Sequence, residues 1–114
     1  MDFKPLDKDF PFDGYEKIDV EVLETFNFEY AGRKTEIEID TDEFTAVCPF
    51  SGLPDFGSVI VRYIPDKKCV ELRSFKYYLL SYRTVGIFYE HLVNRVLDDL
   101  VKVCEPLEMT VEAD

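Results

Sequence analysis

A cysteine at the start of a loop rich in proline and glycine is a candidate nucleophile. Cys48 opens the segment CPFSGLPDFG, which holds two Pro and two Gly in ten residues and directly follows a stretch with strand character. A loop of this kind can turn a side chain into a cleft while the adjoining strands hold its backbone. A buried structural thiol accounts for the same position equally well. The loop by itself therefore leaves both roles open for Cys48.

Two further residues could take part in acid/base chemistry with this thiol. Asp55 lies seven positions after Cys48 in the same loop, and its carboxyl could move protons during addition to a carbon–heteroatom multiple bond. The neighbouring Pro and Phe-Gly are equally typical of an Asx turn. A Cys–His–Asp hydrolase would need the single histidine, His91, which is predicted on a helix and lies far from the loop in the sequence.

Basic residues at the start of a predicted helix form a candidate anion site. Arg73 and Lys76 flank Ser74, the expected N-cap, so two cations and the free N–H groups of a helix end could hold a phosphate. A solvated helix end whose cations balance Glu71 explains the same residues. Glu90, in the first turn of a second helix, could either favour the helix dipole or accept paired N–H donors from a purine-like ligand.

The remaining cysteines are expected to be packing residues. Cys69 lies in a strand-like stretch and Cys104 near the end of a helical one, where a free cysteine is usually a small buried hydrophobe. Three cysteines form an odd number, and no C-x-x-C spacing occurs among them. This pattern argues against a disulfide framework and against a zinc cluster, so no metal is expected.

Length and charge exclude several functional classes. The 114 residues correspond to one domain, and 24 Asp and Glu against 13 Lys and Arg give a net charge of -11, which repels phosphodiester backbones. No apolar run approaches the roughly 20 residues that span a bilayer, and the N-terminal sequence lacks the apolar centre of a signal peptide. We therefore expect a soluble, cytoplasmic protein that binds neither nucleic acid nor membrane. Because so short a chain buries a small share of its surface, we also expect a homo-oligomer.

Residue patterns predict an α+β fold with antiparallel pairing. Residues 1–22 show no sustained hydrophobic period and are expected to form a loosely attached N-terminal arm, followed by a single domain over residues 23–114. Residues 58–64 and 68–72 are predicted to form a hairpin around a Pro-Asp turn. The other expected elements are strands at 24–30, 37–47 and 107–111, the last without its natural hairpin partner, and helices at 74–82 and 87–104.

Three motifs together resemble the QueF nitrile reductase family, the NADPH-dependent 7-cyano-7-deazaguanine reductases of queuosine tRNA modification. CPFSGLPDFG, VELRSFKYYLLSYR and GIFYEHLVNRVLDDLV occur in the family's order between about residues 43 and 113. They match its CP-x(4)-PDF loop, its E-x-[KR]-S-x-K-Y-Y signature and its G-x-F-x-E helix opening. The resemblance implies a tunnelling fold (T-fold) of antiparallel hairpins that carry two helices. It also implies a ring of subunits, expected to be a decamer of two pentamers, with active sites between subunits.

The resemblance also implies roles for individual residues. Cys48 would add to the nitrile carbon of 7-cyano-7-deazaguanine and form a covalent thioimide, and Asp55 would protonate the nitrile nitrogen. NADPH would supply two hydrides and yield 7-aminomethyl-7-deazaguanine. The matched substrate positions are Val70, Glu71, Leu72, Tyr89 and Glu90, of which Glu90 anchors the deazaguanine base, and the matched cofactor-phosphate positions are Arg73, Ser74 and Lys76.

The sequence departs from the family at two places. Family members commonly have a histidine immediately before the anchoring glutamate, where this chain has Tyr89, and His91 follows Glu90 instead. Their chains also continue past the final strand into a segment with an Arg-Gly-Gly turn, whose arginine helps to bind the cofactor. Since this sequence stops at Asp114, the last strand is expected to be truncated.

Other functions remain as alternatives at this level. An amidinotransferase-like relative would use the same Cys and Asp on the nitrile of a modified tRNA, with ammonia in place of hydride, and a net charge of -11 counts against it. A non-enzymatic module that binds a purine or pterin is the other alternative. The GTP cyclohydrolases and pterin synthases that share the fold need zinc ligands that one histidine cannot supply.

Overall fold

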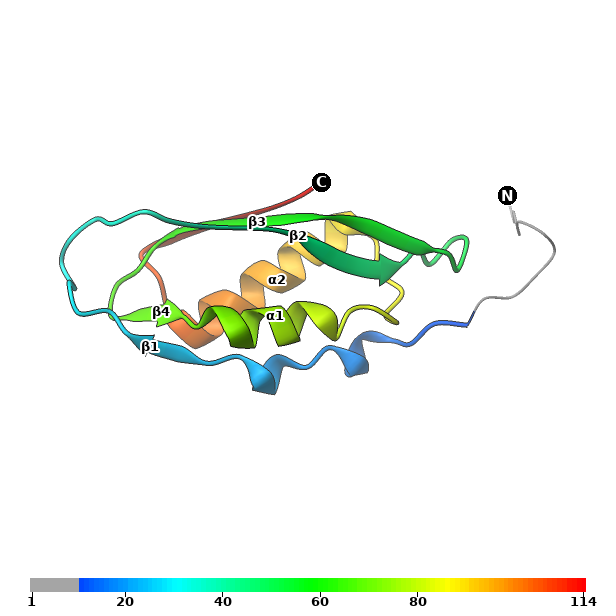
Figure 1. Cartoon of the computed structure of the whole chain (residues 1–114), viewed down its shortest axis with the longest axis horizontal. Coiled ribbons are helices and arrows are strands. Elements are labelled where there is room, and N and C mark those ends of the chain that lie inside the picture. Colours follow the sequence, from blue (N-terminus) through cyan, green and yellow to red (C-terminus); the bar gives the residue numbers. More distant parts are fainter. Residues whose placement is uncertain (1–10) are drawn as a thin grey trace.

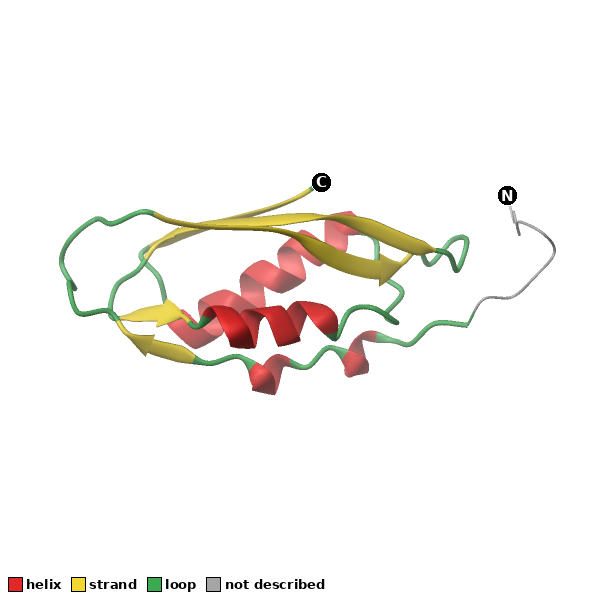
Figure 2. Cartoon of the chain, in the orientation of Figure 1, coloured by secondary structure: helices red, strands yellow, loops and turns green. Residues whose placement is uncertain are grey.

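The computed structural model describes residues 11–114, which form two antiparallel sheets and two helices (Figures 1 and 2). In Figure 1 the larger sheet makes the upper layer, the two helices lie beneath it, and the N-terminal segment runs along the lower side. The elements are the 3-10 helices η2 (Tyr15–Lys17) and η3 (Val20–Val22), the strands β1 (Thr25–Asn27), β2 (Ile37–Val47), β3 (Pro54–Ile64), β4 (Lys68–Val70) and β5 (Glu108–Ala113), and the helices α1 (Leu72–Leu80) and α2 (Tyr89–Cys104).

The three-stranded sheet has the order β2-β3-β5, and its helix-facing side is set by the alternation of side chains along β3. Val59, Val61 and Tyr63 alternate with more exposed residues and are at most 2% exposed. On the opposite side of the core, α1 and α2 bury one stripe each at helical spacing. The buried helix residues include Phe75, Tyr78 and Leu79 of α1 and Leu92, Val96, Leu100 and Cys104 of α2.

A bulge in β2 adjusts which of its side chains face the helices. The pairing of β2 with β3 shifts between Thr41 and Phe44, so Phe44 pairs with Gly57 and Ala46 with Asp55. Phe44 and Ala46 are buried, which places their partners Gly57 and Asp55 on the helix-facing side of β3 as well. The α+β fold class with antiparallel strands is therefore confirmed.

The predicted hairpin between residues 58–64 and 68–72 is wrong. β4 pairs with β1, with Thr25 opposite Val70, and the two strands form a small sheet of their own. β3 instead lies between β2 and β5 and pairs with β5 from Val59 to Ile64. A hydrophobic period identifies a strand but carries no information on its neighbour, and both pairings join segments far apart in the sequence.

Part of the segment expected to be a loosely attached arm is packed against the rest of the chain. Ile18 is 6% exposed and belongs to the hydrophobic core. The Asp13 amide donates to the Thr84 carbonyl over 2.7 Å, so residues 13–22 follow the helical layer closely. The few apolar residues of this stretch pack against α1 without forming a regular period. Residues 1–10 of the expected arm lie outside the described residues.

Within residues 11–114, neither helix is both long and apolar enough to cross a membrane.

Candidate active site

Cys48 lies in a tight loop between β2 and β3. The Cys48 amide donates to the Leu53 carbonyl over 2.9 Å, and the Gly52 amide donates to the Cys48 carbonyl over 2.8 Å. Gly52 has a φ of 74°, in the left-handed region that glycine adopts without a steric penalty. The loop thus returns on itself within a few residues and keeps Cys48 half-buried at the end of β2.

The environment of Cys48 favours the thiolate. A hydrogen bond from the Ser51 hydroxyl lowers the pKa of the Cys48 thiol, with further help from the backbone amides of Ser51 and Phe50. Partial burial and the charge of Asp55 act in the opposite direction, and the net pKa is still lowered. Because the thiolate is the nucleophilic form of cysteine, this site suits covalent addition.

Cys69 and Cys104 have the opposite environment. Both are at most 3% exposed. Burial raises the pKa of the Cys69 thiol, and it raises the pKa of Cys104 to about 11. Their expected role as packing residues agrees with these positions, and Cys48 is the one of the three thiols with a lowered pKa.

Asp55 belongs to a strand and not to a turn. The sequence places residues 54–57 in the loop, but they form the beginning of β3, and Asp55 pairs with Ala46. The Asp55 carbonyl accepts a hydrogen bond of 2.8 Å from the Thr45 hydroxyl, which ties this end of β3 to β2. The carboxyl faces the helices and is close enough to raise the pKa of both Cys48 and Tyr89. Cys48, Asp55 and Tyr89 therefore form one group of residues.

Tyr89 and Glu90 begin α2 beside this group. Phe88 is the N-cap of α2, and the Tyr89 ring packs edge-on against Phe44 with 6.1 Å between the ring centres. Glu90 is exposed in the first turn of the helix, where a carboxylate also favours the positive end of the helix dipole. The Glu90 side chain is thus exposed next to Tyr89 at the start of α2.

Backbone hydrogen bonds connect the start of α2 to Cys48. The Val47 amide donates to the Val85 carbonyl over 2.9 Å, and the Ile87 amide donates to the Val47 carbonyl over 3.1 Å. Val47 directly precedes Cys48, and Ile87 lies two residues before Tyr89. The chain segment before α2 thus fixes the nucleophile loop and the helix start relative to each other.

His91 does not join this group. Its ring is exposed, with Nδ1 3.5 Å from the Tyr15 hydroxyl and the ring centre 6.4 Å from that of Phe88. The Cys–His–Asp arrangement of a hydrolase is therefore not assembled in this chain.

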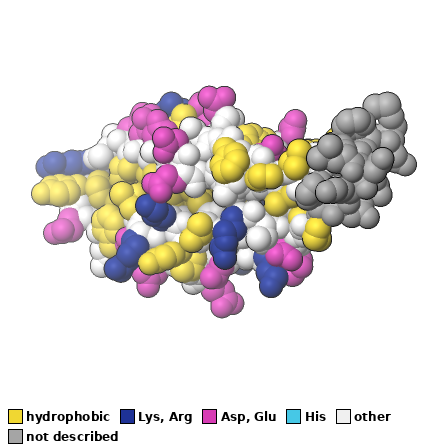
Figure 3. Space-filling model, turned by 45° about the vertical axis from the view of Figure 1, so that its right-hand side comes forward, with side chains coloured by type: hydrophobic (Ala, Val, Ile, Leu, Met, Phe, Trp, Pro, Cys, Tyr) yellow, Lys and Arg dark blue, Asp and Glu magenta, His cyan; other side chains and the backbone are white. Residues whose placement is uncertain are grey.

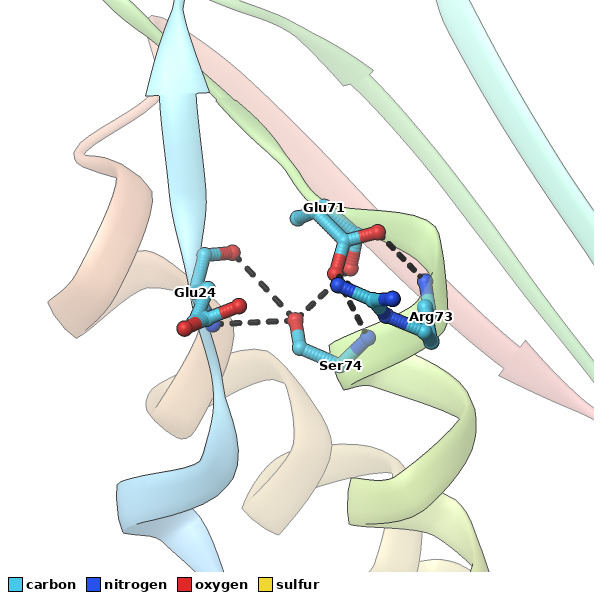
Figure 4. Close-up of polar contacts among 4 residues, drawn as sticks. All are labelled: Glu24, Glu71, Arg73 and Ser74. Atoms are coloured by element: carbon cyan, nitrogen blue, oxygen red, sulfur yellow. Dashed lines mark hydrogen bonds and ion pairs between the residues drawn. The ribbon is translucent and has the colours of Figure 1, made fainter.

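Ser74 is not the N-cap of the first helix. Glu71 is the N-cap of α1, and its carboxylate accepts hydrogen bonds from the amides of Arg73 (2.7 Å) and Ser74 (3.0 Å), as Figure 4 shows. The Ser74 hydroxyl is buried and bonds the Glu24 amide (2.9 Å) and the Glu71 carbonyl (2.7 Å). The N–H groups expected to hold a phosphate are thus already bound to Glu71, and the Ser74 hydroxyl is bound within the chain.

Arg73 and Lys76 face a groove beside α1. The groove has a volume of about 460 Å³ and lies between β2 and α1, with a mostly apolar lining that includes Ile39 and Phe75. The Lys76 ammonium lies 3.2 Å from Glu43 on β2, and both side chains are well exposed. Figure 3 shows a face of the molecule on which basic and hydrophobic side chains lie side by side, with acidic ones around them.

The other predicted substrate positions differ in accessibility. Val70 is 2% exposed and its amide donates to the Tyr63 hydroxyl over 3.0 Å, so both its side chain and its N–H are buried in this chain. Leu72 is 59% exposed at the start of α1. The Glu71 carboxylate acts as a helix cap in this chain, which the sequence expectation did not include.

The predicted site residues thus form two groups. The first group is at the end of β2 and the start of α2 and consists of Cys48, Asp55, Tyr89 and Glu90. The second group, residues 70–76, lies at the end of β4 and the start of α1. In Figure 1 the start of α1 is well separated along the long axis from the end of β2 and the start of α2. One chain does not bring the two groups together.

Two residues near Cys48 were not identified from the sequence. Ser51 is the first contributor to the lowered pKa of Cys48, and Gly57 lies under the Tyr89 hydroxyl. A hydroxyl three residues after a cysteine in a tight loop is a usable signal for the first. The second depends on a contact between β3 and α2 that no local pattern indicates. Among residues 11–114, no group of three or more His, Cys, Asp or Glu side chains is placed to hold a metal ion.

Comparisons with known proteins identify the family of this chain. A family model described as QueF-like protein matches residues 54–114. Two proteins named NADPH-dependent 7-cyano-7-deazaguanine reductase are 55% identical (Caldicellulosiruptor bescii) and 53% identical (Caldanaerobacter subterraneus subsp. tengcongensis) over 111 residues. These alignments cover 97% of this chain and 85% and 83% of the relatives.

A solved structure gives a second comparison. The apo crystal structure of an archaeosine synthase QueF-Like is 27% identical to this chain, with a TM-score of 0.67 over 71% of this chain and 80% of that one. The family resemblance carried by the three sequence motifs is thereby confirmed. The chain therefore belongs to the QueF family, and the two relatives that are 55% and 53% identical to it are named NADPH-dependent 7-cyano-7-deazaguanine reductases.

Proposed function

We propose that this chain reduces the nitrile of 7-cyano-7-deazaguanine to an aminomethyl group with NADPH, in the synthesis of the tRNA nucleoside queuosine. The observation that carries the proposal is the Cys48 thiol, whose pKa is lowered by Ser51 and by backbone amides, beside the carboxyl of Asp55. A thiol with a lowered pKa next to a proton donor suits addition to a carbon–nitrogen triple bond. The names of the relatives that are 53% and 55% identical supply the substrate and the reductant.

Cys48 and Asp55 divide the first step between them. The Cys48 thiolate forms a bond to the nitrile carbon, one π bond of the nitrile breaks, and the nitrogen takes a proton from the Asp55 carboxyl. The products are a thioimide on Cys48 and an Asp55 carboxylate, so charge and protons balance. After reduction, the carbon–sulfur bond breaks and the Cys48 thiolate leaves, which frees the imine for a second reduction. NADPH supplies one hydride for each of the two reductions, and solvent supplies the proton that the nitrogen takes in the second.

Arg73 and Lys76 are the residues that fit the phosphates of NADPH. Their charges face the same groove, and the apolar lining of that groove suits the flat rings of a dinucleotide. An exposed ion pair such as Lys76–Glu43 contributes about 0–1 kcal/mol, so Lys76 can leave Glu43 for a phosphate at small cost. We do not include Ser74 in this site, because its hydroxyl is buried and bound to Glu24 and Glu71.

Glu90 is proposed to anchor the base, since a carboxylate accepts the paired N–H donors of a deazaguanine edge. Val70, Glu71 and Leu72 are proposed to complete the substrate site from a neighbouring subunit. Support for this comes from the separation of the two residue groups in one chain. We propose that copies of the chain assemble as a T-fold ring, a decamer of two pentamers, in which the two groups meet at subunit interfaces.

A shared site predicts complementation between inactive variants. Cys48→Ala and Arg73→Ala are each expected to be inactive alone, but mixed after reversible dissociation they should regain activity. Random mixing brings an intact Cys48 and an intact Arg73 together at about one interface in four, which sets the upper limit of the recovered rate. Activity of the mixed assembly is compared with that of each variant taken through the same procedure. If each site were contained within one chain, mixing the two variants would recover no activity, which would contradict a shared site.

The proposed reaction predicts a fixed stoichiometry. Purified protein should oxidise two NADPH for each nitrile consumed, followed by NADPH absorbance, with the aminomethyl product identified by mass. The amidinotransferase alternative predicts instead turnover of nitrile-bearing tRNA with ammonia and no NADPH oxidation. Since the archaeosine synthase is 27% identical and the named reductases 53–55%, the alternative is not favoured. Nitrile binding without NADPH oxidation would support the purine-binding alternative.

The cytoplasmic location and a single T-fold domain over residues 23–114 remain predictions.

A further inference from the structure

The Tyr89 hydroxyl has no hydrogen-bond partner although it is buried. Among residues 11–114 it is the one buried side-chain polar atom in this condition. A buried donor without a partner lowers the stability of the folded chain, because it has lost its hydrogen bonds to water. Phenylalanine would fill the same position without that loss. The hydroxyl at this position therefore calls for a role other than stability.

The fold keeps open the space that this hydroxyl occupies. A Cβ atom on Gly57 would overlap the Tyr89 hydroxyl and the Asp114 carbonyl oxygen, so a glycine in β3 lets the phenol approach the strand. Phe44, opposite Gly57 in the sheet, packs against the Tyr89 ring and holds its direction. The hydroxyl is thus placed against the helix-facing side of β3.

Asp55 is the neighbour on that side. It precedes Gly57 by two residues, and alternate residues of a strand share a face, so Asp55 lies on the same helix-facing side of β3 as the glycine that the Tyr89 hydroxyl approaches. Burial is the main cause of the raised pKa of Tyr89, and the charges of Asp55 and Asp114 contribute. The phenol therefore keeps its proton and can only donate to a carboxylate beside it. Hydrogen bonds used in catalysis are often open before the substrate binds.

We propose that Tyr89 is a positioning residue for Asp55, whose carboxyl it holds by donating a hydrogen bond as Asp55 loses its proton. The inference rests on the proposed function and assigns a partner to the proton donor of that reaction. In the first step the Asp55 proton moves to the nitrile nitrogen and negative charge develops on the carboxylate. A donor already fixed beside that charge stabilises the transition state more than the ground state. The Tyr89 proton stays on the phenol throughout.

The test compares Tyr89→Phe with the wild-type protein in two measurements. The first is steady-state turnover. The second is the rate of thioimide formation on Cys48, measured by intact mass in the absence of NADPH. We expect kcat and the rate of thioimide formation to fall by roughly ten- to hundred-fold, because a hydrogen bond to a charged group is lost. KM for the nitrile should stay within about two-fold, since in this role the hydroxyl acts on the Asp55 carboxyl and not on the substrate, whereas a substrate-binding role for Tyr89 would raise KM. The Tm should be unchanged or higher.

Tyr82→Phe is the matched control. The Tyr82 hydroxyl is also buried, but it has a partner, the Tyr78 hydroxyl at 2.7 Å, and it lies outside the proposed site. This variant should lower the Tm and leave kcat unchanged, the reverse of Tyr89→Phe. In an Asp55→Asn background, adding Tyr89→Phe should change thioimide formation by less than about two-fold, because the two residues act through one carboxyl.

Several results would overturn the inference. An unchanged kcat in Tyr89→Phe, or a rise in KM alone, would mean that the hydroxyl does not assist Asp55. A loss of kcat in Asp114→Asn as large as that in Tyr89→Phe would assign the hydroxyl to Asp114. Failure of the wild-type protein to form the adduct and to oxidise NADPH would count against the proposed function, which separates the two ideas.

Discussion

Replacing Cys48 with Ala is expected to lower the rate of nitrile reduction by about ten-thousand-fold, since no other group can form the bond to the nitrile carbon. The protein should still fold, because the side chain is half-buried in a loop and contributes little to the core. NADPH oxidation on addition of 7-cyano-7-deazaguanine measures the loss, and intact mass should show no covalent adduct. A variant that retains more than a few per cent of the wild-type rate would rule out Cys48 as the nucleophile.

Cys69→Ala is the control for this experiment. It removes a thiol from the buried strand β4, so we expect lower stability and a near wild-type rate at a temperature where the variant is folded. Reactivity gives a second readout. Iodoacetamide should label Cys48 first, at a rate that rises with pH and levels off once the lowered pKa is passed. Ser51→Ala removes the hydroxyl that stabilises the thiolate, so the pKa should rise and labelling at neutral pH should slow.

Replacing Asp99 with Ala is expected to cause the largest loss of stability of the substitutions considered. Asp99 is 8% exposed on α2, and its carboxylate accepts hydrogen bonds from the Tyr78 hydroxyl (2.6 Å) and from Arg95 Nε (2.9 Å). The Tyr82 hydroxyl extends this chain by bonding Tyr78. Burial raises the pKa of both phenols, so they stay protonated and the Tyr78 hydroxyl can donate to the carboxylate.

Removal of the carboxylate leaves the half-buried guanidinium of Arg95 without its acceptor and leaves Tyr78 with only the Tyr82 hydroxyl as a partner. The expected loss in free energy of unfolding is about 3–5 kcal/mol, a large share of the stability of a domain this size. Denaturant unfolding measures it. If Asp99→Ala does not fold, Asp99→Asn keeps an acceptor for Tyr78 and should lose about 1–3 kcal/mol.

Asp98 offers a matched control for this change. It is the adjacent residue of the same helix with the same charge, and it is exposed. Asp98→Ala should change the free energy of unfolding by at most about 0.5 kcal/mol. Equal losses in the two variants would mean that helix charge, and not the buried hydrogen bonds, accounts for the effect.

Local patterns were sufficient for several features of the chain. Cys48 and Asp55 were predicted as site residues from a ten-residue segment, and the structure places Cys48 in a tight loop and Asp55 at the start of β3, while their catalytic roles stay predictions. The second helix was predicted over residues 87–104 and found at Tyr89–Cys104, since its apolar spacing and the following Pro are local signals. The order of three motifs was enough to identify the family.

Local patterns failed where the partner of a residue or strand comes from a distant segment of the chain. Ser74 has the residue type of an N-cap, yet Glu71 takes that position, because the Ser74 hydroxyl is bound to the Glu24 backbone from a segment fifty residues earlier in the chain. The sequence predicts that β4 pairs with β3, because the two strands are close along the chain, but in the structure β4 pairs with β1. Both outcomes depend on which surfaces the folded chain brings together.

The sequence by itself thus determined the chemistry available to this protein: a loop cysteine, a nearby carboxyl, and the motif order of a nitrile reductase family. The tertiary structure decided which of those groups meet. It lowers the pKa of Cys48 through Ser51, places the Tyr89 hydroxyl over Gly57, and separates the start of α1, which carries Arg73, from the end of β2, which Cys48 follows. The physical reason is that residue type and spacing set the local conformation, while burial and long-range contacts set the state and the partners of each group.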